Sequence, residues 1–388
     1  MKKKVAIIGS TGSIGKTTFN IFHKNKNQFE IVLLTTNTNI NELIKQSKAF
    51  NVKNLIVTDK KKFLLIKEKL KNKKINLFNN FGSFNKIFKN KIDYTMSSIS
   101  GLEGLKPTID IIKHTKKIAI ANKESIICAW NLINRKLKKH KTIFIPVDSE
   151  HFSIWSILNG INEDKIEKIV ITASGGPFLN LPLSKFKNIS VKKALKHPNW
   201  SMGEKISIDS ATMMNKVFEI IEAKNIFNLD YNKLSILIHP KSYVHAIVKF
   251  TDGLTKILVH DTSMSIPIFN SIYSKNDNQR LKSKKLNIST LNNLSFTNID
   301  KKKFPLVDIL SKLPKNISLF ETILVTVNDA LVQKFLNNEI KFTDITKLFL
   351  KFINDNNFLK YKKISPKSVE EVIKLSNYVS LKINAKGV

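Results

Sequence analysis

The sequence predicts an α/β protein with a doubly wound, Rossmann-like parallel sheet, then an α+β domain, then a helical bundle. Three observations predict this order. Short apolar runs alternate with helical patterns up to about residue 149, strand-like runs lie between residues 168 and 259, and only helical periodicity remains after residue 302. A chain of 388 residues with 42% hydrophobic residues can bury more than one core.

The first domain is expected over residues 1–147. Its strands are expected at Val5–Gly9, Ile31–Thr36, Asn54–Thr58, Lys117–Asn122 and Thr142–Val147. Helical patterns separate these runs, and alternating β and α segments form parallel sheets with helices on both faces.

The second domain is expected over residues 148–273, followed by a polar, turn-rich linker over 274–301 and a helical domain over 302–388. The patterns of the second domain predict a helix and four strands: Ala211–Phe227, Lys168–Thr172, Leu234–His239, Tyr243–Phe250 and Thr255–Val259. In the last domain the patterns predict three helices: Glu321–Leu336, Asp344–Phe352 and Val369–Ile383. Ser368 and Glu371 have the spacing of a capping box before the last of them.

The net charge of +35 is carried almost entirely by lysine, because Arg135 and Arg280 are the only arginines. The lysines are spread over every segment, and arginine is the residue that reads guanine. We therefore expect no specific nucleic-acid partner, although the charge favours anionic substrates. No apolar run approaches the roughly 18 residues of a membrane span, so no membrane partner is expected. The single cysteine, Cys128, excludes an intrachain disulfide and fits a cytoplasmic protein.

Two motifs follow predicted strands of the first domain. Gly9, Gly12 and Gly15 form a G-x-x-G-x-x-G turn that opens a helix, where a backbone can approach a pyrophosphate closely. Asn122-Lys123-Glu124 stands at the carboxyl end of a strand and suits contacts to ribose, nicotinamide or substrate. The alternatives are a glycine turn that binds nothing and a helix N-cap with exposed charges.

Asp148 and Glu150 are two residues apart, so on an extended backbone both side chains point the same way. Two carboxylates that face one direction repel unless a cation or a proton lies between them. Oxygen ligands of this kind suit Mg²⁺ or Mn²⁺ better than Zn²⁺. The alternative is an exposed acidic strand end.

Further polar groups stand on the helix expected after Ser210. Asn215 and Glu219 are four residues apart and Lys216 and Glu219 three apart, so all three share one polar flank of this helix. The alternative is an ordinary Lys–Glu pair on the surface.

Two loops complete the set of motifs. The turn Ser174-Gly-Gly-Pro177 could offer backbone N–H groups to a phosphate. Residues 196–203 place Trp200 between Pro198 and Gly203, which suits a lid that excludes water. The alternative is a packed loop with Trp200 in the core.

Six of these segments, in order and with similar spacing, resemble the 1-deoxy-D-xylulose 5-phosphate reductoisomerase family of isoprenoid biosynthesis through methylerythritol phosphate. The matching segments are Gly-Ser-Thr-Gly-Ser-Ile-Gly (9–15), Ala-Asn-Lys-Glu-Ser (121–125), Pro-Val-Asp-Ser-Glu-His (146–151), Ser-Gly-Gly-Pro-Phe (174–178), His-Pro-Asn-Trp-Ser-Met-Gly (197–203) and Ile-Asp-Ser-Ala-Thr-Met-Met-Asn-Lys (208–216). The resemblance extends over nearly the whole chain and weakens beyond about residue 250.

The resemblance implies a role for each matching residue. A divalent metal (Mg²⁺, Mn²⁺ or Co²⁺) would be held by Asp148, Glu150 and Glu219. NADPH would be held by Thr11, Gly12, Ser13, Ile14, Asn37, Asn39, Asn122, Glu124 and Gly203. The sugar phosphate substrate would be contacted by Lys123, Ser149, Glu150, Ser174, His197, Ser210, Asn215, Lys216 and Glu219, with Ser174, Ser210, Asn215 and Lys216 on its phosphate. Catalytic roles would fall to Glu150, Lys123 and His197, and Trp200 and Met202 would belong to the lid.

The implied reaction is a metal-assisted retro-aldol and aldol rearrangement of 1-deoxy-D-xylulose 5-phosphate, followed by reduction with hydride from NADPH to 2-C-methyl-D-erythritol 4-phosphate. Residues 1–147 would bind the dinucleotide, and residues 148–273 would carry the catalytic site and the contacts of a homodimer. Two alternatives stay open: another nicotinamide oxidoreductase acting on a phosphorylated sugar, and a degenerate relative that binds polyanions.

The chain departs from the family pattern at several positions. Asn37-Thr38-Asn39 replaces the usual Gly-Lys-Asn, which removes a candidate lysine partner for the 2′-phosphate, and Glu204 replaces a basic residue. These changes leave the preference for NADPH over NADH open. His260 begins a run that is usually Gly-x-Pro-Asp-Met-Arg, and Asn328-Asp329 replaces an Asn-Glu pair.

Overall fold

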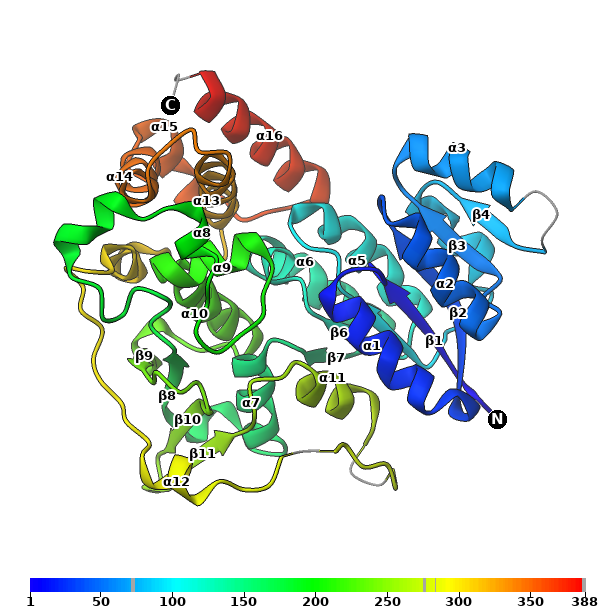
Figure 1. The fold of residues 1–388 in the computed structure, drawn as a ribbon, viewed down its shortest axis with the longest axis horizontal. Coiled ribbons are helices and arrows are strands. Elements are labelled where there is room, and N and C mark those ends of the chain that lie inside the picture. The colour runs from blue at the N-terminus through cyan, green and yellow to red at the C-terminus, as the bar shows by residue number, and fades with distance from the viewer. Residues whose placement is uncertain (71–73, 275–276, 283, 386–388) are drawn as a thin grey trace. The chain divides into compact units, whose positions relative to one another are not determined.

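The computed structural model describes residues 1–70, 74–274, 277–282 and 284–385. The chain forms two compact units (Figure 1). The first comprises Met1–Ser125, Leu132–Asp148 and Met264–Leu281, and the second comprises Ile126–Asn131, Ser149–Ser263 and Lys282–Val388. The linker and the C-terminal domain expected from the sequence include residues 275–276, 283 and 386–388, which lie outside the described residues.

The first unit is built on a parallel sheet, which has seven strands in the described residues and the order β4-β3-β2-β1-β5-β6-β7. The strands are β1 (Lys3–Ile8), β2 (Phe29–Thr36), β3 (Asn54–Val57), β4 (Asn76–Phe78), β5 (Tyr94–Ser97), β6 (Lys117–Ile120) and β7 (Ile143–Pro146). Its helices are α1 (Ser13–Lys24), α2 (Ile40–Phe50), α3 (Lys60–Lys69), α4 (Phe84–Ile87), α5 (Leu105–Ile111), most of α6 (Lys123–His140) and α11 (Ser265–Ile272). This confirms the expected Rossmann-like sheet.

The strand order reverses between β1 and β5, which pair with each other at the centre of the sheet. Ligands of open α/β sheets bind beyond the carboxyl ends of the strands at such a point. The glycine turn follows β1, Asn122 follows β6 and Asp148 follows β7, so all three stand at this edge.

The second unit contains a mixed sheet with the order β11-β10-β8-β9. Its strands are β8 (Ile166–Ala173), β9 (Leu234–Ile238), β10 (Val244–Phe250) and β11 (Thr255–Val259), as expected. Helices α7 (Ser149–Leu158) and α10 (Met214–Ile226) pack on the sheet, and Ile154, Ile169, Ile220 and Ala246 belong to one apolar core. The remaining short helices of this part are α8 (Val191–Ala194), α9 (Glu204–Thr212) and α12 (Ile288–Asn292).

The prediction of one helix over Ala211–Phe227 is wrong at its start, because the helix is interrupted at Met213. This residue has φ 64, a left-handed conformation, so α9 ends at Thr212 and α10 begins at Met214. The expected extended backbone at Asp148 and Glu150 is also wrong, because β7 ends at Pro146 and Glu150 lies in the first turn of α7.

The chain ends in a group of helices, as expected: α13 (Phe320–Leu336), α14 (Phe342–Ile353), α15 (Asn356–Leu359) and α16 (Val369–Ala385). Helix α13 packs against α9, α14 and α16. The capping box before α16 is half formed: Ser368 Oγ accepts from the Glu371 amide at 3.2 Å, while Glu371 accepts from the Lys367 amide instead. Among the described helices, none has the length and apolar sequence needed to cross a membrane.

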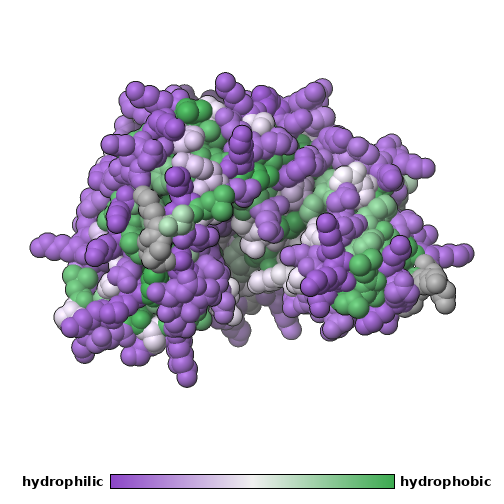
Figure 2. Space-filling view, turned by 90° about the horizontal axis from the view of Figure 1, so that it is seen from above, coloured by the Kyte–Doolittle hydropathy of each residue, from purple (hydrophilic) through white to green (hydrophobic). Residues whose placement is uncertain are grey.

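The surface is covered with separate hydrophilic side chains over most of the face seen in Figure 2, with apolar residues in small patches between them. This distribution agrees with lysines spread along the whole sequence.

Glu321, in the first turn of α13, provides a test of how the second unit tolerates a buried charge. The residue is 1% exposed, and burial raises its pKa to about 7 although Ser318 and Lys224 lower it. The folded state therefore holds the proton of Glu321 more tightly than the unfolded chain does, and this proton binding stabilises the folded state. The stabilisation is complete below pH 4.5 and is lost as pH rises through about 7.

We therefore expect Glu321→Gln to unfold at a higher temperature than the wild type at about pH 8.5. The difference in the free energy of unfolding between about pH 5 and pH 8.5 should shrink by about 3 kcal/mol. Thermal unfolding across this pH range is the measurement, with the exposed Glu163→Gln as control. Parallel curves for wild type and Glu321→Gln would contradict the assignment.

Candidate active site

The glycine turn after β1 leaves the first amides of α1 open to a ligand. Gly9 has φ 82, which favours glycine, and a Cβ on Gly15 would lie 2.6 Å from the Ser10 Cα. The turn is tied to β2, because the Ser10 amide donates to Thr35 O at 2.9 Å and the Thr11 and Thr36 hydroxyls lie 2.7 Å apart. Within the described residues no side chain caps α1, so the helix N-terminus can accept an anion.

Asn122 organises the strand end that carries the second motif. Its amide nitrogen donates to Ile99 O and Gly101 O at 2.5 and 2.8 Å, and its oxygen accepts from the Ser125 amide at 2.7 Å. Lys123 is 8% exposed and its ammonium lies 3.1 Å from an Asp148 oxygen. The lysine is thus placed by the start of α6 and held by the carboxylate that follows β7.

The remaining residues expected at the cofactor lie at three places. Ser13 and Ile14 begin α1, while Asn37 and Asn39 follow β2. Asn39 caps α2 by accepting from the Glu42 amide at 3.2 Å, and Asn37 accepts from the Thr58 hydroxyl at 3.0 Å. Glu124 is 7% exposed beside Asn122, and Gly203 is the N-cap of α9 in the second unit.

Glu150 and Glu219 form a buried pair of carboxylates in the second unit. They are 9% and 1% exposed, and the Lys216 ammonium lies between them, 2.5 Å from an oxygen of each. Burial lowers the pKa of Lys216, but the charges and hydrogen bonds of Glu150 and Glu219 raise it above its usual value. Asn215 donates to Glu219 as well, so the expected i,i+3 and i,i+4 relations on α10 are both realised as contacts.

Asp148 completes a group of three carboxylates. The unit boundary cuts the Asp148–Ser149 peptide bond, so the chain itself holds Asp148 beside Glu150. One oxygen from each of Asp148, Glu150 and Glu219 lies within 4.8 Å of the others. Three carboxylate oxygens at this spacing fit a hard divalent cation such as Mg²⁺. A second group with the same spread of atoms joins Asp148 to His151 and Glu222.

His151 and Glu222 lie next to Glu219 in the interior, and the sequence predicted no role for either residue. The Glu219 carbonyl accepts from His151 Nε2 at 2.8 Å, which fixes the proton on that nitrogen. His151 Nδ1 then faces Glu222, 3.9 Å away, and both residues are almost fully buried. Their sequence signal is faint, because Glu222 is one turn after Glu219 on a helix that is otherwise mostly apolar.

Ser174 and His197 form a polar pair beside α9. The Asn199 and Trp200 amides donate to His197 Nδ1 at 3.2 and 3.0 Å, so the proton of the neutral ring is on Nε2, 2.9 Å from Ser174 Oγ. Burial, together with the charge of Lys216, lowers the pKa of His197 to about 4, so the ring is neutral near pH 7. Ser174 Oγ also accepts from the Gly176 amide, so the serine hydrogen can point to a ligand oxygen.

The loop over residues 196–203 is anchored to the sheet of the second unit. Asn199 donates to Pro240 O and Ser242 Oγ at 2.6 and 2.8 Å, and Trp200 meets the His245 ring edge-on at 6.1 Å. The His245 ring also stacks on the His260 ring, with 3.6 Å between ring centroids. His260, which stands where the family pattern has glycine, therefore extends this row of rings. Trp200 is half-buried and Met202 follows it in the same loop.

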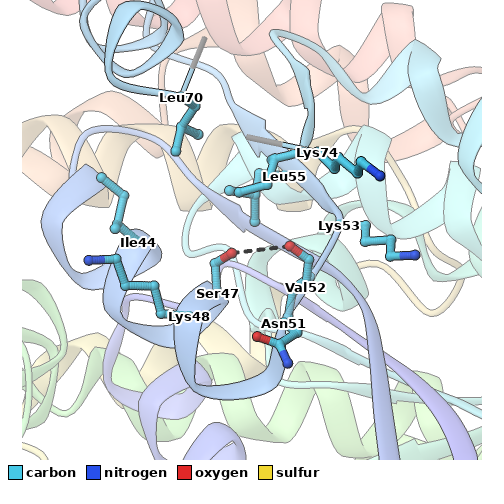
Figure 3. Close-up of a pocket in the computed structure, with 10 residues that line it drawn as sticks. Ile44, Ser47, Lys48, Asn51, Val52, Lys53, Leu55, Leu70 and Lys74 are labelled. Atoms are coloured by element: carbon cyan, nitrogen blue, oxygen red, sulfur yellow. Dashed lines mark hydrogen bonds between the residues drawn. The ribbon is translucent and has the colours of Figure 1, made fainter. Parts of the chain in front are cut away.

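A hollow in the first unit lies away from these residues. It has a volume of about 270 Å³, and Figure 3 shows Ile44, Leu55 and Leu70 with Lys48, Lys53 and Lys74 around it. Ile44 and Lys48 belong to α2, Lys53 precedes β3 and Leu55 lies near its start, Leu70 follows α3 and Lys74 precedes β4, which places the hollow at the amino ends of the strands. The predicted site residues of this unit are at the carboxyl ends instead.

Comparisons with known proteins identify the family. The model described as 1-deoxy-D-xylulose 5-phosphate reductoisomerase matches residues 5–130, and models of the C-terminal domain of that enzyme match residues 144–227 and 260–380. The reductoisomerase of Pelagibacter ubique is 62% identical over 388 residues, which is 100% of both chains. The chain belongs to the 1-deoxy-D-xylulose 5-phosphate reductoisomerase family. The reductoisomerase of Wolbachia pipientis is 40% identical over 351 residues, which is 89% of each chain.

Solved structures of 1-deoxy-D-xylulose 5-phosphate reductoisomerases agree along the whole chain. The enzyme of Zymomonas mobilis in complex with NADPH has a TM-score of 0.88, 30% identity and 99% coverage of both chains. A reductoisomerase in complex with NADPH, fosmidomycin and magnesium has a TM-score of 0.90 and 30% identity, covering 99% of this chain and 98% of that one. Membership confirms the expected fold class and enzyme class, and the expected cofactors are those that these relatives bind.

Two glycines of the turn after β1 separate a structural role from a binding role. A Cβ on Gly15 would meet backbone of Gly9 and Ser10, whereas a Cβ on Gly12 would meet Gly9 O at an ordinary 3.7 Å. We expect Gly15→Ala to lower the free energy of unfolding by about 2 kcal/mol. Gly12→Ala should keep stability and weaken NADPH binding, because a methyl group there would stand between the backbone and a pyrophosphate.

Chemical denaturation and NADPH fluorescence titration of both variants measure the two effects. A Gly12→Ala variant that binds NADPH like the wild type would contradict the binding role of the turn.

Proposed function

We propose that the protein converts 1-deoxy-D-xylulose 5-phosphate to 2-C-methyl-D-erythritol 4-phosphate with NADPH and a divalent metal. The observation that carries this proposal is the buried Glu150–Lys216–Glu219 cluster beside Asp148. A nicotinamide dehydrogenase without a rearrangement step has no need of three carboxylates at its substrate. The cluster therefore favours the reductoisomerase over another oxidoreductase and over a degenerate polyanion-binding relative.

Asp148, Glu150 and Glu219 would hold the metal. When bound, the cation supplies Lewis-acid stabilisation of negative charge on the ketone and hydroxyl oxygens of the substrate. Glu150 would move a hydroxyl proton of the substrate. Its carboxylate is held in a fixed orientation, because Ser149 donates to one oxygen and the other lies 2.5 Å from Lys216. Lys123 orients Asp148 through their 3.1 Å ion pair and offers an ammonium to a substrate oxygen.

The substrate phosphate would be held by Ser174, Ser210, Asn215 and Lys216. The neutral His197 ring supports this role by donating to Ser174, which orients the serine hydroxyl outward. With its pKa lowered to about 4 by burial and by the charge of Lys216, the ring is neutral near pH 7 and keeps this donor arrangement there. Gly176 packs directly on Ser210 and Ala211, since a Cβ there would lie 2.8 Å from Ser210 O.

The nicotinamide cofactor would be bound by the turn after β1 and by Asn37, Asn39, Asn122, Glu124 and Gly203, with Trp200 and Met202 as parts of a lid. Asn39 caps α2 and Asn37 accepts from Thr58, so the side-chain oxygen of each already has a partner within the first unit. With no lysine in Asn37-Thr38-Asn39, recognition of the 2′-phosphate has to come from elsewhere, and comparing NADPH with NADH tests it.

The enzyme would work as a homodimer in the cytoplasm. Val170, Ile247 and Ile257 occupy paired positions across β8, β10 and β11, and Ile257 is 50% exposed. An apolar sheet face of this kind suits a second copy of the chain. The lone buried Cys128 fits a reducing compartment.

The activity is tested directly with purified protein, 1-deoxy-D-xylulose 5-phosphate and Mg²⁺ or Mn²⁺. We expect loss of NADPH absorbance that requires both the substrate and the metal, with a smaller kcat/KM for NADH. Protein that binds NADPH and metal but shows no substrate-dependent oxidation would refute the reductoisomerase assignment.

The structure offers two candidate metal sites, Asp148–Glu150–Glu219 and Asp148–His151–Glu222, and substitutions of Glu219 and Glu222 distinguish them. Glu219→Gln should weaken Mn²⁺ binding by at least about tenfold, because a charged oxygen ligand is lost, while NADPH affinity stays the same. Glu222→Gln, one turn along α10, should change Mn²⁺ affinity much less. Electron paramagnetic resonance of Mn²⁺ measures both. A larger loss in Glu222→Gln would assign the metal to the Asp148–His151–Glu222 group instead.

A further inference from the structure

Helix α9 carries a buried carboxylate that the proposed mechanism does not use. Asp209 is 1% exposed and immediately precedes Ser210. A carboxylate in the interior is costly unless hydrogen bonds and an opposite charge satisfy it. The partners of Asp209 therefore show what the helix is built to contact.

Those partners tie α9 to helix α13. Asn328 Nδ2 donates to Asp209 at 2.7 Å, across 119 residues of sequence. The Lys205 ammonium lies 2.9 Å from Asp209 and 3.1 Å from Asp329, so it joins the same two helices. It also lies 5.2 Å from the centre of the Phe218 ring, which belongs to α10. One cluster thus links α9, α10 and α13.

Burying Asn328 costs free energy, and this cost indicates that its hydrogen bond to Asp209 contributes to the structure. The residue is fully buried, and among the described residues its side-chain oxygen has no hydrogen-bond partner. A leucine would fill the same space without an unsatisfied oxygen. The amide orientation is set by Asp209, because a rotated amide would face its oxygen toward the carboxylate.

Helix α9 is also in close contact with the turn that contains Gly176. A Cβ on Gly176 would lie 2.8 Å from Ser210 O and 3.1 Å from Ala211 Cα, so the Ser174–Gly176 turn is in direct contact with the helix backbone. Helix α9 is therefore held between this turn and α13. The helix ends at Met213, directly before Asn215 and Lys216 in α10, so its position also sets where α10 begins.

We propose that Asn328 and Lys205 are positioning residues for the substrate phosphate and act through Asp209 on Ser210 and on the start of α10. The proposal rests on the proposed function, in which Ser210, Asn215 and Lys216 hold that phosphate. It gives helix α13 a part in substrate binding although none of its residues was assigned to the site. Loss of the Asn328 bond tilts α9 and weakens phosphate binding, while the carboxylates of Glu150 and Glu219 and the cofactor turn keep their places.

Steady-state kinetics of Asn328→Leu test the proposal. We expect KM for 1-deoxy-D-xylulose 5-phosphate to rise about tenfold, as for loss of one hydrogen bond to a charged group, with kcat and NADPH affinity each within about threefold of the wild type. Inorganic phosphate should protect the wild type against thermal unfolding more than it protects the variant. Thr326→Val on the same helix breaks the bond to Ser376 and should leave KM unchanged.

The exchange variant Asp209→Asn with Asn328→Asp restores an amide–carboxylate bond in the opposite direction. It should restore most of the affinity for 1-deoxy-D-xylulose 5-phosphate that Asn328→Leu loses. If Asn328→Leu does not fold, Lys205→Met, which keeps most of the side chain but removes the ammonium that joins Asp209 to Asp329, decides the question through its own KM.

Unchanged KM in a folded Asn328→Leu, or in Lys205→Met, overturns the proposal. A rise in KM accompanied by comparable decreases in kcat and NADPH affinity and by a lower melting temperature also overturns the proposal, because that result assigns the cluster a structural role only. A wild type without turnover would instead refute the proposed function, and the two failures are therefore distinguishable.

Discussion

Two buried carboxylates, Glu150 and Glu219, impose the requirement that the rest of the site satisfies. They are too deeply buried to be neutralised by solvent, so a cation has to be supplied from within the protein or from a bound metal. Lys216, three residues before Glu219 on the same helix, provides a positive charge. His151 holds the backbone of Glu219 by a hydrogen bond from Nε2 to the Glu219 carbonyl. The helices α7 and α10 that carry these groups are held by the apolar core that they share with the mixed sheet.

The break at Met213 would let two helices contribute to the proposed phosphate site. In a continuous helix Ser210 and Asn215 would be five residues apart and about 140° apart around the axis, at about 100° per residue. They could not then share one flank. The left-handed Met213 ends α9 and starts α10 in a new direction, and a buried methionine in this conformation persists only because the surrounding packing holds it. The cluster at Asp209 is part of that packing.

The sequence predicted what depends on short-range periodicity. The strands with alternating or continuous apolar residues were predicted correctly, and the contacts of Asn215 and Lys216 with Glu219 follow from their spacing on one helix. It missed β4, which has three residues, and β5, whose buried residues include Thr95 and Ser97 and give no apolar run.

It also missed what depends on distant partners. A left-handed methionine has no local signal comparable to glycine, and Asp209 cannot be recognised as buried until Asn328 folds against it.

The charges that matter at this site are few compared with those on the surface. The lysines that produce the net charge of +35 are mostly exposed, and salt screens exposed charges beyond about 10 Å at 0.1 M. Lys123 and Lys216 are buried and each lies within 3.1 Å of a carboxylate, so salt screens these pairs little. In the proposed function, recognition of a phosphorylated substrate would therefore depend on where these two ammonium groups are held. A contact as remote as Asn328 would then act on the site through position alone, without adding any charge to it.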